Sequence, residues 1–150
     1  MADLRPADDI SIPDDERLYF RVYPAPDALV PIPDEPAQFR PHSGSVRPNN
    51  REEPLSVDLG SLSTPEQTRD RETDGNFHVV MITAATVRQL GLRIMKDPIT
   101  DSDVPNPAHA LILGSRKNPD RNQVGGLTGS DCSKLARAFR AVIVTPQQDR

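Results

Sequence analysis

A chain of 150 residues that is 35% apolar and holds 16 prolines is long enough for one small domain, but it is too poor in apolar residues for all of it to be packed core. The lack of tryptophan and an aromatic content of 4% argue against a stacking surface for single-stranded nucleic acid. A single cysteine, Cys132, excludes an internal disulfide and a paired-cysteine metal site.

The N-terminal stretch and the overall composition point to a soluble, cytoplasmic protein. The sequence MADLRPADDISIPDDER is acidic and has no apolar segment of the secretory kind, and no apolar run reaches the length of a membrane helix. We expect a flexible acidic arm at residues 1–16, a single domain at 17–146 and a C-terminal tail at 147–150. Fifteen arginines against three lysines are typical of a GC-rich genome.

The first expected core element is a strand at residues 17–23. Its sequence, RLYFRVY, alternates between two sides, as the pleat of a half-buried strand requires. One side carries Leu18, Phe20 and Val22, and the other carries Tyr19, Arg21 and Tyr23.

Residues 24–54 hold eight of the sixteen prolines and predict a long proline-rich loop. Proline lacks an amide donor and restricts the residue before it, so neither a helix nor a central strand is expected to persist here. Such a loop could wrap the core, bind a partner or stay disordered. A few apolar residues suggest that it docks at isolated points: Leu29, Val30, Ile32 and Phe39.

A short strand, LSVDL at residues 55–59, is expected next, followed by a polar helix. Thr64 fits the N-cap, Pro65 the first helical position and Gln67 the third, and together they make a capping box. We expect this helix to end near Asp74–Gly75. Because its residues are nearly all polar, it should lie on the surface and bury little.

The rest of the chain alternates between short strands and short helices. Strands are expected at 77–82, 92–96, 109–114 and 141–145, and helices at 84–90 and 131–140, with a loop at 115–130. Gly91 is expected to end the first of these helices. The short helices are interleaved irregularly with the strands. The pattern therefore predicts a small single α+β domain with a mixed or antiparallel sheet, short helices and a long proline-rich loop.

His109 stands where an acidic, proline-containing loop runs into the apolar strand at 109–114. Two interpretations remain open. As a structural residue, its ring would bond a loop carbonyl; as a site residue, it would act as a general base, because imidazole titrates near neutral pH. No metal site is expected, since His42, His78 and His109 are not at metal-ligand spacing.

Three other motifs match known sites only in part. The acidic stretch Asp101–Asp103 lacks the downstream glycine and glutamate of a calcium-binding EF-hand, so we expect an acidic turn. Gly125–Asp131 is glycine-rich but has neither phosphate-loop pattern, and we expect a turn with Ser130 or Asp131 as the N-cap of the next helix. Cys132, in the first turn of that helix, is expected to be a packing residue.

Arg21 on the first strand, Ser56 on the second and a downstream carboxylate follow one another along the chain. This order resembles the arginine, serine and glutamate order of ADP-ribosyltransferase-like domains, which implies an enzyme acting on a nucleotide-like anion. The glutamate pair at a strand end has no counterpart, since the only glutamates after Ser56 are Glu66 and Glu72 on the expected surface helix.

Charge is unevenly distributed along the chain. Residues 1–110 carry 11 basic and 19 acidic side chains, a net charge of −8, whereas residues 111–150 carry 7 basic and 3 acidic ones, a net charge of +4. Either the basic C-terminal part lies against the acidic front, or it presents an anion-binding face. The candidate anion-binding residues are Arg116, Lys117, Arg121, Lys134, Arg137 and Arg140.

These observations give three hypotheses of function. The leading one is an accessory or protein-interaction module without catalysis of its own, which has another protein as its partner and needs no cofactor. The second is an ADP-ribosyltransferase-like enzyme, active or degenerate, with Arg21, Ser56 and His109 as candidate catalytic residues. The third is a nucleic-acid accessory protein that contacts phosphates through the basic C-terminal region. The sequence leaves the oligomeric state open.

Overall fold

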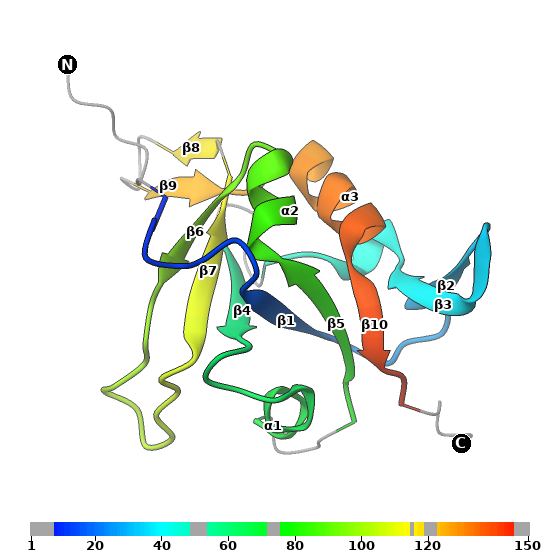
Figure 1. Ribbon diagram of the computed structural model, residues 1–150, viewed down its shortest axis with the longest axis horizontal. Coiled ribbons are helices and arrows are strands. Elements are labelled where there is room, and N and C mark those ends of the chain that lie inside the picture. The colour runs from blue at the N-terminus through cyan, green and yellow to red at the C-terminus, as the bar shows by residue number, and fades with distance from the viewer. Residues whose placement is uncertain (1–7, 49–53, 72–75, 115, 119–122, 146–150) are drawn as a thin grey trace.

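The computed structural model describes residues 8–48, 54–71, 76–114, 116–118 and 123–145 (Figure 1). They form a small α+β domain built on one six-stranded antiparallel sheet with the strand order β10-β5-β1-β4-β7-β6. The strands of this sheet are β1 (Arg17–Val22), β4 (Leu55–Leu59), β5 (His78–Thr83), β6 (Arg93–Lys96), β7 (His109–Leu113) and β10 (Arg140–Ile143). The expected α+β class is confirmed, and the sheet is the antiparallel alternative.

The long proline-rich loop is not confirmed, because part of residues 24–54 forms a two-stranded antiparallel hairpin. In it, β2 (Leu29–Ile32) pairs with β3 (Glu35–Pro41), and a short 3-10 helix, η1 (Ser43–Ser45), follows. Each strand of a two-stranded ribbon has one unpaired side, so proline fits wherever its missing amide is not needed. The proline content ruled out a central strand, and this hairpin indeed stands outside the main sheet.

Three short helices complete the fold: α1 (Pro65–Asp70), α2 (Ala84–Gln89) and α3 (Gly129–Ala138). The capping box of α1 is confirmed, since the Thr64 hydroxyl accepts from the Gln67 N–H and the Gln67 side chain accepts from the Thr64 N–H. Gly91 follows α2 with a φ of 82°, a conformation that favours glycine at a helix end. Within the described residues, no helix has the length and apolar content needed to cross a membrane.

The segment leading into α3 differs from the prediction. A hairpin of β8 (Arg116–Asn118) and β9 (Gln123–Gly126) stands where a loop was expected. The N-cap of α3 is Thr128 rather than Ser130 or Asp131. The Thr128 hydroxyl accepts from the Asp131 N–H, and the Asp131 carboxylate accepts from the Thr128 N–H. This reciprocal pair satisfies amides that the first helical turn leaves unbonded, so the helix starts earlier than predicted.

The two faces of the sheet are covered differently. Helices α2 and α3 lie beside each other over one face (Figure 1), where Leu18, Leu55 and Ile112 are fully buried in the core. Helix α1 lies apart from them and contacts β1, β5 and β10 on the opposite face. Thr68 of α1 is only 2% exposed, so this helix buries more than its polar sequence suggests. The rest of the second face, over β1, β4 and β7, is hollow.

Residues 8–16 are anchored to α2 and β6. Arg88 binds the carboxylates of Asp8 and Asp14 at 3.0 and 2.6 Å, and it also donates to the carbonyl oxygens of Asp9 and Ile12. Ile12 is 1% exposed and belongs to the core. This part of the expected acidic arm is thus tied to the domain, and residues 1–7 lie outside the described chain.

Candidate functional site

Adjacent strands bring polar side chains into one row on the hollow face of the sheet. The strand register places Tyr19 opposite Asp58, and Asp58 opposite His109. Asp97, just after β6, continues the row, because its backbone N–H donates to the carbonyl of His109 at 3.0 Å. Side chains directly opposite each other on antiparallel strands are close enough to interact. The row therefore joins residues that are far apart in the sequence.

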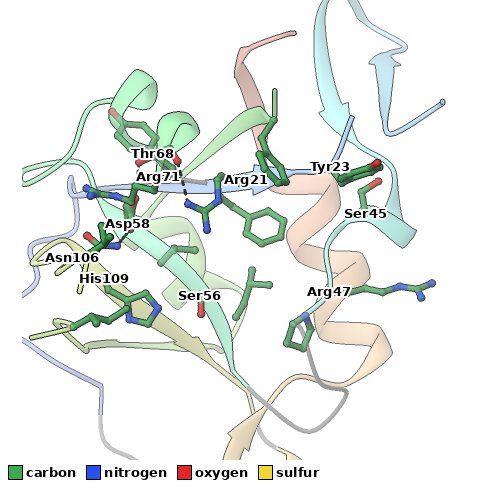
Figure 2. A pocket seen from close by; sticks show the side chains of 18 of the residues that line it. Arg21, Tyr23, Ser45, Arg47, Ser56, Asp58, Thr68, Arg71, Asn106 and His109 are labelled. Atoms are coloured by element: carbon green, nitrogen blue, oxygen red, sulfur yellow. Dashed lines mark hydrogen bonds and ion pairs between the residues drawn. The ribbon is translucent and has the colours of Figure 1, made fainter. Parts of the chain in front are cut away.

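A second row lies one step along the strands. Side chains on one face recur every second residue, so Arg21 follows Tyr19 on β1 and Ser56 precedes Asp58 on β4. The pairing of β1 with β4 ends at Tyr19 and Asp58, so Arg21 and Ser56 lie beyond the paired residues, and both line one cavity. Figure 2 shows both of them on the side of the sheet that carries Asp58 and His109. The three candidate catalytic residues, Arg21, Ser56 and His109, therefore share one site.

An open cavity of about 520 Å³ stands over these two rows. Its volume falls in the range of pockets that hold drug-sized organic molecules. One wall is the loop between β6 and β7, which contributes the apolar Ile99, Val104 and Pro105. Ser45 and Arg47 bound the opposite side, and Figure 2 shows the Arg47 side chain directed away from the other labelled residues.

Asp58 is a buried carboxylate at the floor of this cavity, with donors on both of its oxygens. Its Oδ2 accepts from the Thr68 hydroxyl and from Arg71 Nε, both at 2.8 Å, and its Oδ1 accepts from the Asn106 amide at 2.9 Å. Burial raises the pKa of Asp58. The hydrogen bonds from Asn106, Arg71 and Thr68, with the charge of Arg71, outweigh burial and hold that pKa below its ordinary value. Asp58 is therefore ionised and neutralised within the protein.

Arg21 lies beside this network, next to an aromatic wall. Its guanidinium donates to the carbonyl oxygen of Thr68 at 3.2 Å and lies 5.8 Å from the centre of the Phe77 ring. Tyr23 meets Phe77 edge-on, with ring centres 6.2 Å apart. A guanidinium over an aromatic face keeps its charge and its fixed donor geometry. The cavity thus combines a fixed positive charge with an aromatic surface.

His109 is held by Asp97 through one ring nitrogen. Its Nδ1 lies 2.8 Å from the Asp97 carbonyl oxygen and 3.1 Å from the Asp97 carboxylate. A carbonyl oxygen only accepts, so Nδ1 carries the proton and Nε2 is the acceptor of the neutral ring. His109 thus bonds a loop carbonyl, which is the contact that its structural interpretation expects. The same ring also lines the cavity that contains Arg21.

The basic C-terminal residues do not join this site as far as the structure describes them. Lys134 and Arg137 are exposed on α3, and Arg140 donates to the carbonyl oxygens of Arg137 and Phe139. None of these three lines the cavity. Arg116 and Lys117 belong to β8, and Arg121 lies outside the described residues.

A second cavity, of about 560 Å³, lies between η1 and the start of α3. Its lining includes His42, Cys132 and Ser133. His42 Nδ1 accepts a hydrogen bond from the Gly44 N–H at 3.0 Å, which turns that nitrogen toward its own loop. Cys132 is partly buried and packs against the core, as the sequence predicted.

Three residues of the site were not expected from the sequence. Thr68 and Arg71 belong to a polar run in which no pattern marks the side chains that turn inward. Asn106 lies in the acidic loop, where its carbonyl accepts from the Ala108 N–H at 3.1 Å while its amide binds Asp58. The signal that could have pointed to these three residues is Asp58 itself. A carboxylate on a strand that other elements cover needs buried hydrogen-bond donors.

Two further expectations concern metals and the acidic turn. Asp101–Asp103 is an exposed bend, in agreement with the predicted acidic turn. Across the described ranges, no group of three His, Cys, Asp or Glu side chains is arranged to hold a metal ion.

Comparison with family models, with curated protein sequences and with solved structures finds no match for this chain. For the resemblance to ADP-ribosyltransferase-like domains, Arg21 and Ser56 line the same cavity, whereas Glu66 is exposed on α1 and Glu72 lies outside the described residues.

Proposed function

We propose that this domain is an accessory module that binds a small organic anion on the hollow face of its sheet, without catalysis of its own. The observation that carries this proposal is the convergence of Arg21, Ser56 and His109 in one open cavity of about 520 Å³. The guanidinium of Arg21 and the hydroxyl of Ser56 are hydrogen-bond donors, and the positive charge of the guanidinium favours an anion. The volume and the aromatic wall favour an organic molecule over an inorganic ion.

Two features favour binding over an enzyme of the ADP-ribosyltransferase-like type. The acidic group at the floor is Asp58, whose oxygens are already occupied by Thr68, Arg71 and Asn106. No hydrogen bond joins Ser56 to His109 within the described residues, so the serine has no base to activate it. The anion is thus expected to be held rather than transformed.

Binding can be tested by calorimetry and thermal unfolding with a panel of aryl phosphates, aryl sulfates and nucleotides. We expect at least one of them to raise Tm in proportion to its occupancy. Arg21→Gln should weaken that ligand strongly, and Ser56→Leu should block it by filling the floor of the cavity. Arg137→Gln, which changes an exposed arginine on α3 away from the cavity, is the matched control.

Ser56 is exposed and its hydroxyl makes no hydrogen bond to the described residues, so Ser56→Leu should fold even if Arg21→Gln does not. If no organic anion in the panel binds at millimolar concentration, the proposal is wrong. The same holds if binding persists in both cavity variants.

A second candidate is a surface for docking another protein. The exposed apolar side chains of Val142 on β10 and of Val144 just after it, 43% and 53% exposed, favour it. If a purified partner forms a stoichiometric complex with the domain, a double substitution to lysine at these positions should weaken that complex. Unchanged affinity would exclude this surface.

A further inference from the structure

We infer that the organic anion is a short extended peptide with a free carboxylate, and that it binds through its main chain in an opening of the sheet between β1 and β4. This inference rests on the proposed function and names the ligand class of the same site. One amide of the peptide bonds to the backbone of Ser56, and an aromatic side chain packs against Tyr23.

The opening lies where the two middle strands of the sheet separate. Pairing of β1 with β4 ends at Tyr19 and Asp58. Beyond these residues, β1 continues along β5 as far as Val22, and β4 continues along β7 as far as Leu55. Each strand thus keeps its outer neighbour, whereas the ladder between the two strands is interrupted.

The cavity of about 520 Å³ reaches into this opening. Successive side chains of a strand point to opposite faces of a sheet, yet the lining contains consecutive residues of both strands. They are Phe20 and Arg21 on β1, and Leu55, Ser56 and Val57 on β4. Leu55 and Val57, 0% and 3% exposed, belong to the core on the face that α2 and α3 cover. Lining residues from both faces place part of the cavity between the strands.

The backbone of Ser56 faces the opening. In an antiparallel ladder, the backbone groups of successive residues point to opposite neighbours. The Leu59 N–H donates to the carbonyl oxygen of Ala108 at 2.8 Å, so the backbone of Leu59 is directed toward β7. The backbones of Asp58 and Ser56 are then directed toward β1, where Asp58 pairs with Tyr19. For the N–H and the carbonyl of Ser56, the described residues provide no hydrogen-bond partner.

A donor and an acceptor on one residue of an exposed strand favour a secondary amide as the ligand group. The N–H of Ser56 can bond a ligand carbonyl, and the carbonyl of Ser56 can accept from a ligand N–H. An ionised carboxylate or a sulfate group has only acceptors, so it would leave the Ser56 carbonyl without a donor. An extended peptide satisfies both groups at once, as in the recognition of peptides by strand addition.

The surroundings of the opening fit the rest of such a peptide. Tyr23, which is 65% exposed, and Phe77 form an aromatic wall beyond the end of β1. An aromatic side chain next to the bonded amide can pack on this wall. The carboxylate of the peptide supplies the negative charge that the proposed function requires.

The test uses two probes that differ in a single group. N-acetyl-L-phenylalanine has one amide, an aromatic side chain and a carboxylate, and O-acetyl-L-3-phenyllactate replaces only the amide N–H with an ester oxygen. Binding is measured by calorimetry and by intrinsic fluorescence, because both tyrosines of the chain, Tyr19 and Tyr23, line the cavity and tryptophan is absent. We expect the amide to bind about three to ten times more tightly, since the ester places an oxygen opposite the Ser56 carbonyl.

Three variants test the protein side of the contact. Ser56→Pro removes the backbone N–H, which points away from β7, so the ladder between β4 and β7 is kept. Ser56→Ala lacks the same hydroxyl but keeps the N–H, and it is the reference. Ser56→Pro should bind N-acetyl-L-phenylalanine about three to ten times more weakly than Ser56→Ala. Tyr23→Ala, at an exposed side chain, should lower the affinity for this probe to that for N-acetyl-L-alanine.

Equal affinity of the wild type for the amide and the ester would overturn the inference, whether or not Ser56→Pro folds. If an aryl phosphate binds in a manner that Ser56→Leu abolishes, while N-acetyl-L-phenylalanine does not bind, the inference is wrong and the proposed function stands. If neither these probes nor the panel of organic anions binds, both are wrong. Equal affinity of the wild type for N-acetyl-L-alanine and N-acetyl-L-phenylalanine would overturn the assignment of the aromatic side chain.

Discussion

Arg71 Nε lies 2.8 Å from Oδ2 of Asp58, and this ion pair fastens the end of α1 to the middle of the sheet. Helix α1 has only six residues, and a helix this short is not stable by itself. Its position also sets the carbonyl oxygen of Thr68, which accepts from Arg21. The position of Arg21 in the candidate site therefore depends on the ion pair between Arg71 and Asp58.

We expect Asp58→Asn to lower the free energy of unfolding by about 2–3 kcal/mol, because Arg71 loses its anionic partner and a buried hydrogen-bond network is broken. Urea unfolding measures this difference. The control is Asp70→Asn, which changes an exposed carboxylate paired with Arg69 and should have little effect. Equal losses of stability in the two variants would show that the burial of the Asp58–Arg71 ion pair does not contribute to the free energy of unfolding.

The contribution of Asp58 should also depend on pH. The pKa of this carboxyl is lower in the folded protein than the value of about 3.9 expected when unfolded. Its stabilisation is thus fully present above about pH 4 and is lost as pH falls through the lower folded value. The difference between wild type and Asp58→Asn should accordingly shrink in acid. A difference that stays constant down to about pH 3 would contradict this assignment.

Arg88→Ala should release residues 8–16 from the domain. The substitution removes ion pairs to Asp8 and Asp14 and two bonds to backbone carbonyls, and it should cost about 1–2 kcal/mol of stability. Hydrogen exchange should be faster at the Asp9 N–H, which donates to the Ile94 carbonyl, and at the Ile94 N–H, which donates to the Asp8 carboxylate. Arg137→Ala, at an exposed arginine, is the control and should leave this protection intact.

Two glycines with open space around them should respond differently to alanine. A Cβ added at Gly91 or at Gly129 meets no atom within 4 Å, but Gly91 alone of the two has a positive φ, of 82°. Gly91→Ala should therefore destabilise the protein by about 1 kcal/mol through backbone strain. Gly129→Ala, at the first residue of α3, should be neutral or slightly stabilising. Thermal unfolding distinguishes the two, and equal losses of stability would contradict the assignment of the Gly91 effect to its positive φ.

His78 should make the fold sensitive to mild acid. Burial lowers the pKa of His78, and its Nδ1 accepts from the Thr145 N–H at 3.0 Å. Since the unfolded chain takes up a proton below about pH 6.5 and the folded chain does so only at lower pH, acid favours unfolding in that interval. His78→Asn keeps an acceptor but cannot titrate. Its stability relative to wild type should improve between about pH 6.5 and 5, and a constant difference would exclude this role.

The main-sheet strands were predictable because alternation and apolar runs are local signals. Strands β1, β4 and β7 lie within about one residue of their expected ends, and the capping box of α1 was read from three residues. The same alternation predicted that Arg21 and Leu18 lie on opposite faces of the sheet. It could not reveal the register between strands, and the register is what brings Tyr19, Asp58 and His109 into one row.

The elements that were missed depend on context beyond the local pattern. The β2–β3 hairpin tolerates proline because it stands outside the main sheet, a fact that proline content alone does not reveal. The anchoring of residues 8–16 depends on Arg88, which is about 80 residues away in the sequence from Asp8. Thr128 caps α3 in a reciprocal pair with Asp131, whereas the sequence predicts Ser130 or Asp131 as the N-cap. Each of these outcomes needed the tertiary structure.

The anchored N-terminal segment also covers part of the edge strand β6. The backbone N–H and carbonyl of Ile94 point away from β7, and they are bonded by the Asp8 carboxylate and the Asp9 N–H. An uncovered strand edge of this kind is a template for pairing with another chain. A chain shortened to begin at Arg17 would lose the apolar anchor Ile12 and would bare this edge at once. We therefore expect the acidic segment to limit edge-to-edge association, because the Asp8 carboxylate and the Asp9 N–H occupy the free edge of Ile94 and Arg88 holds the segment in place.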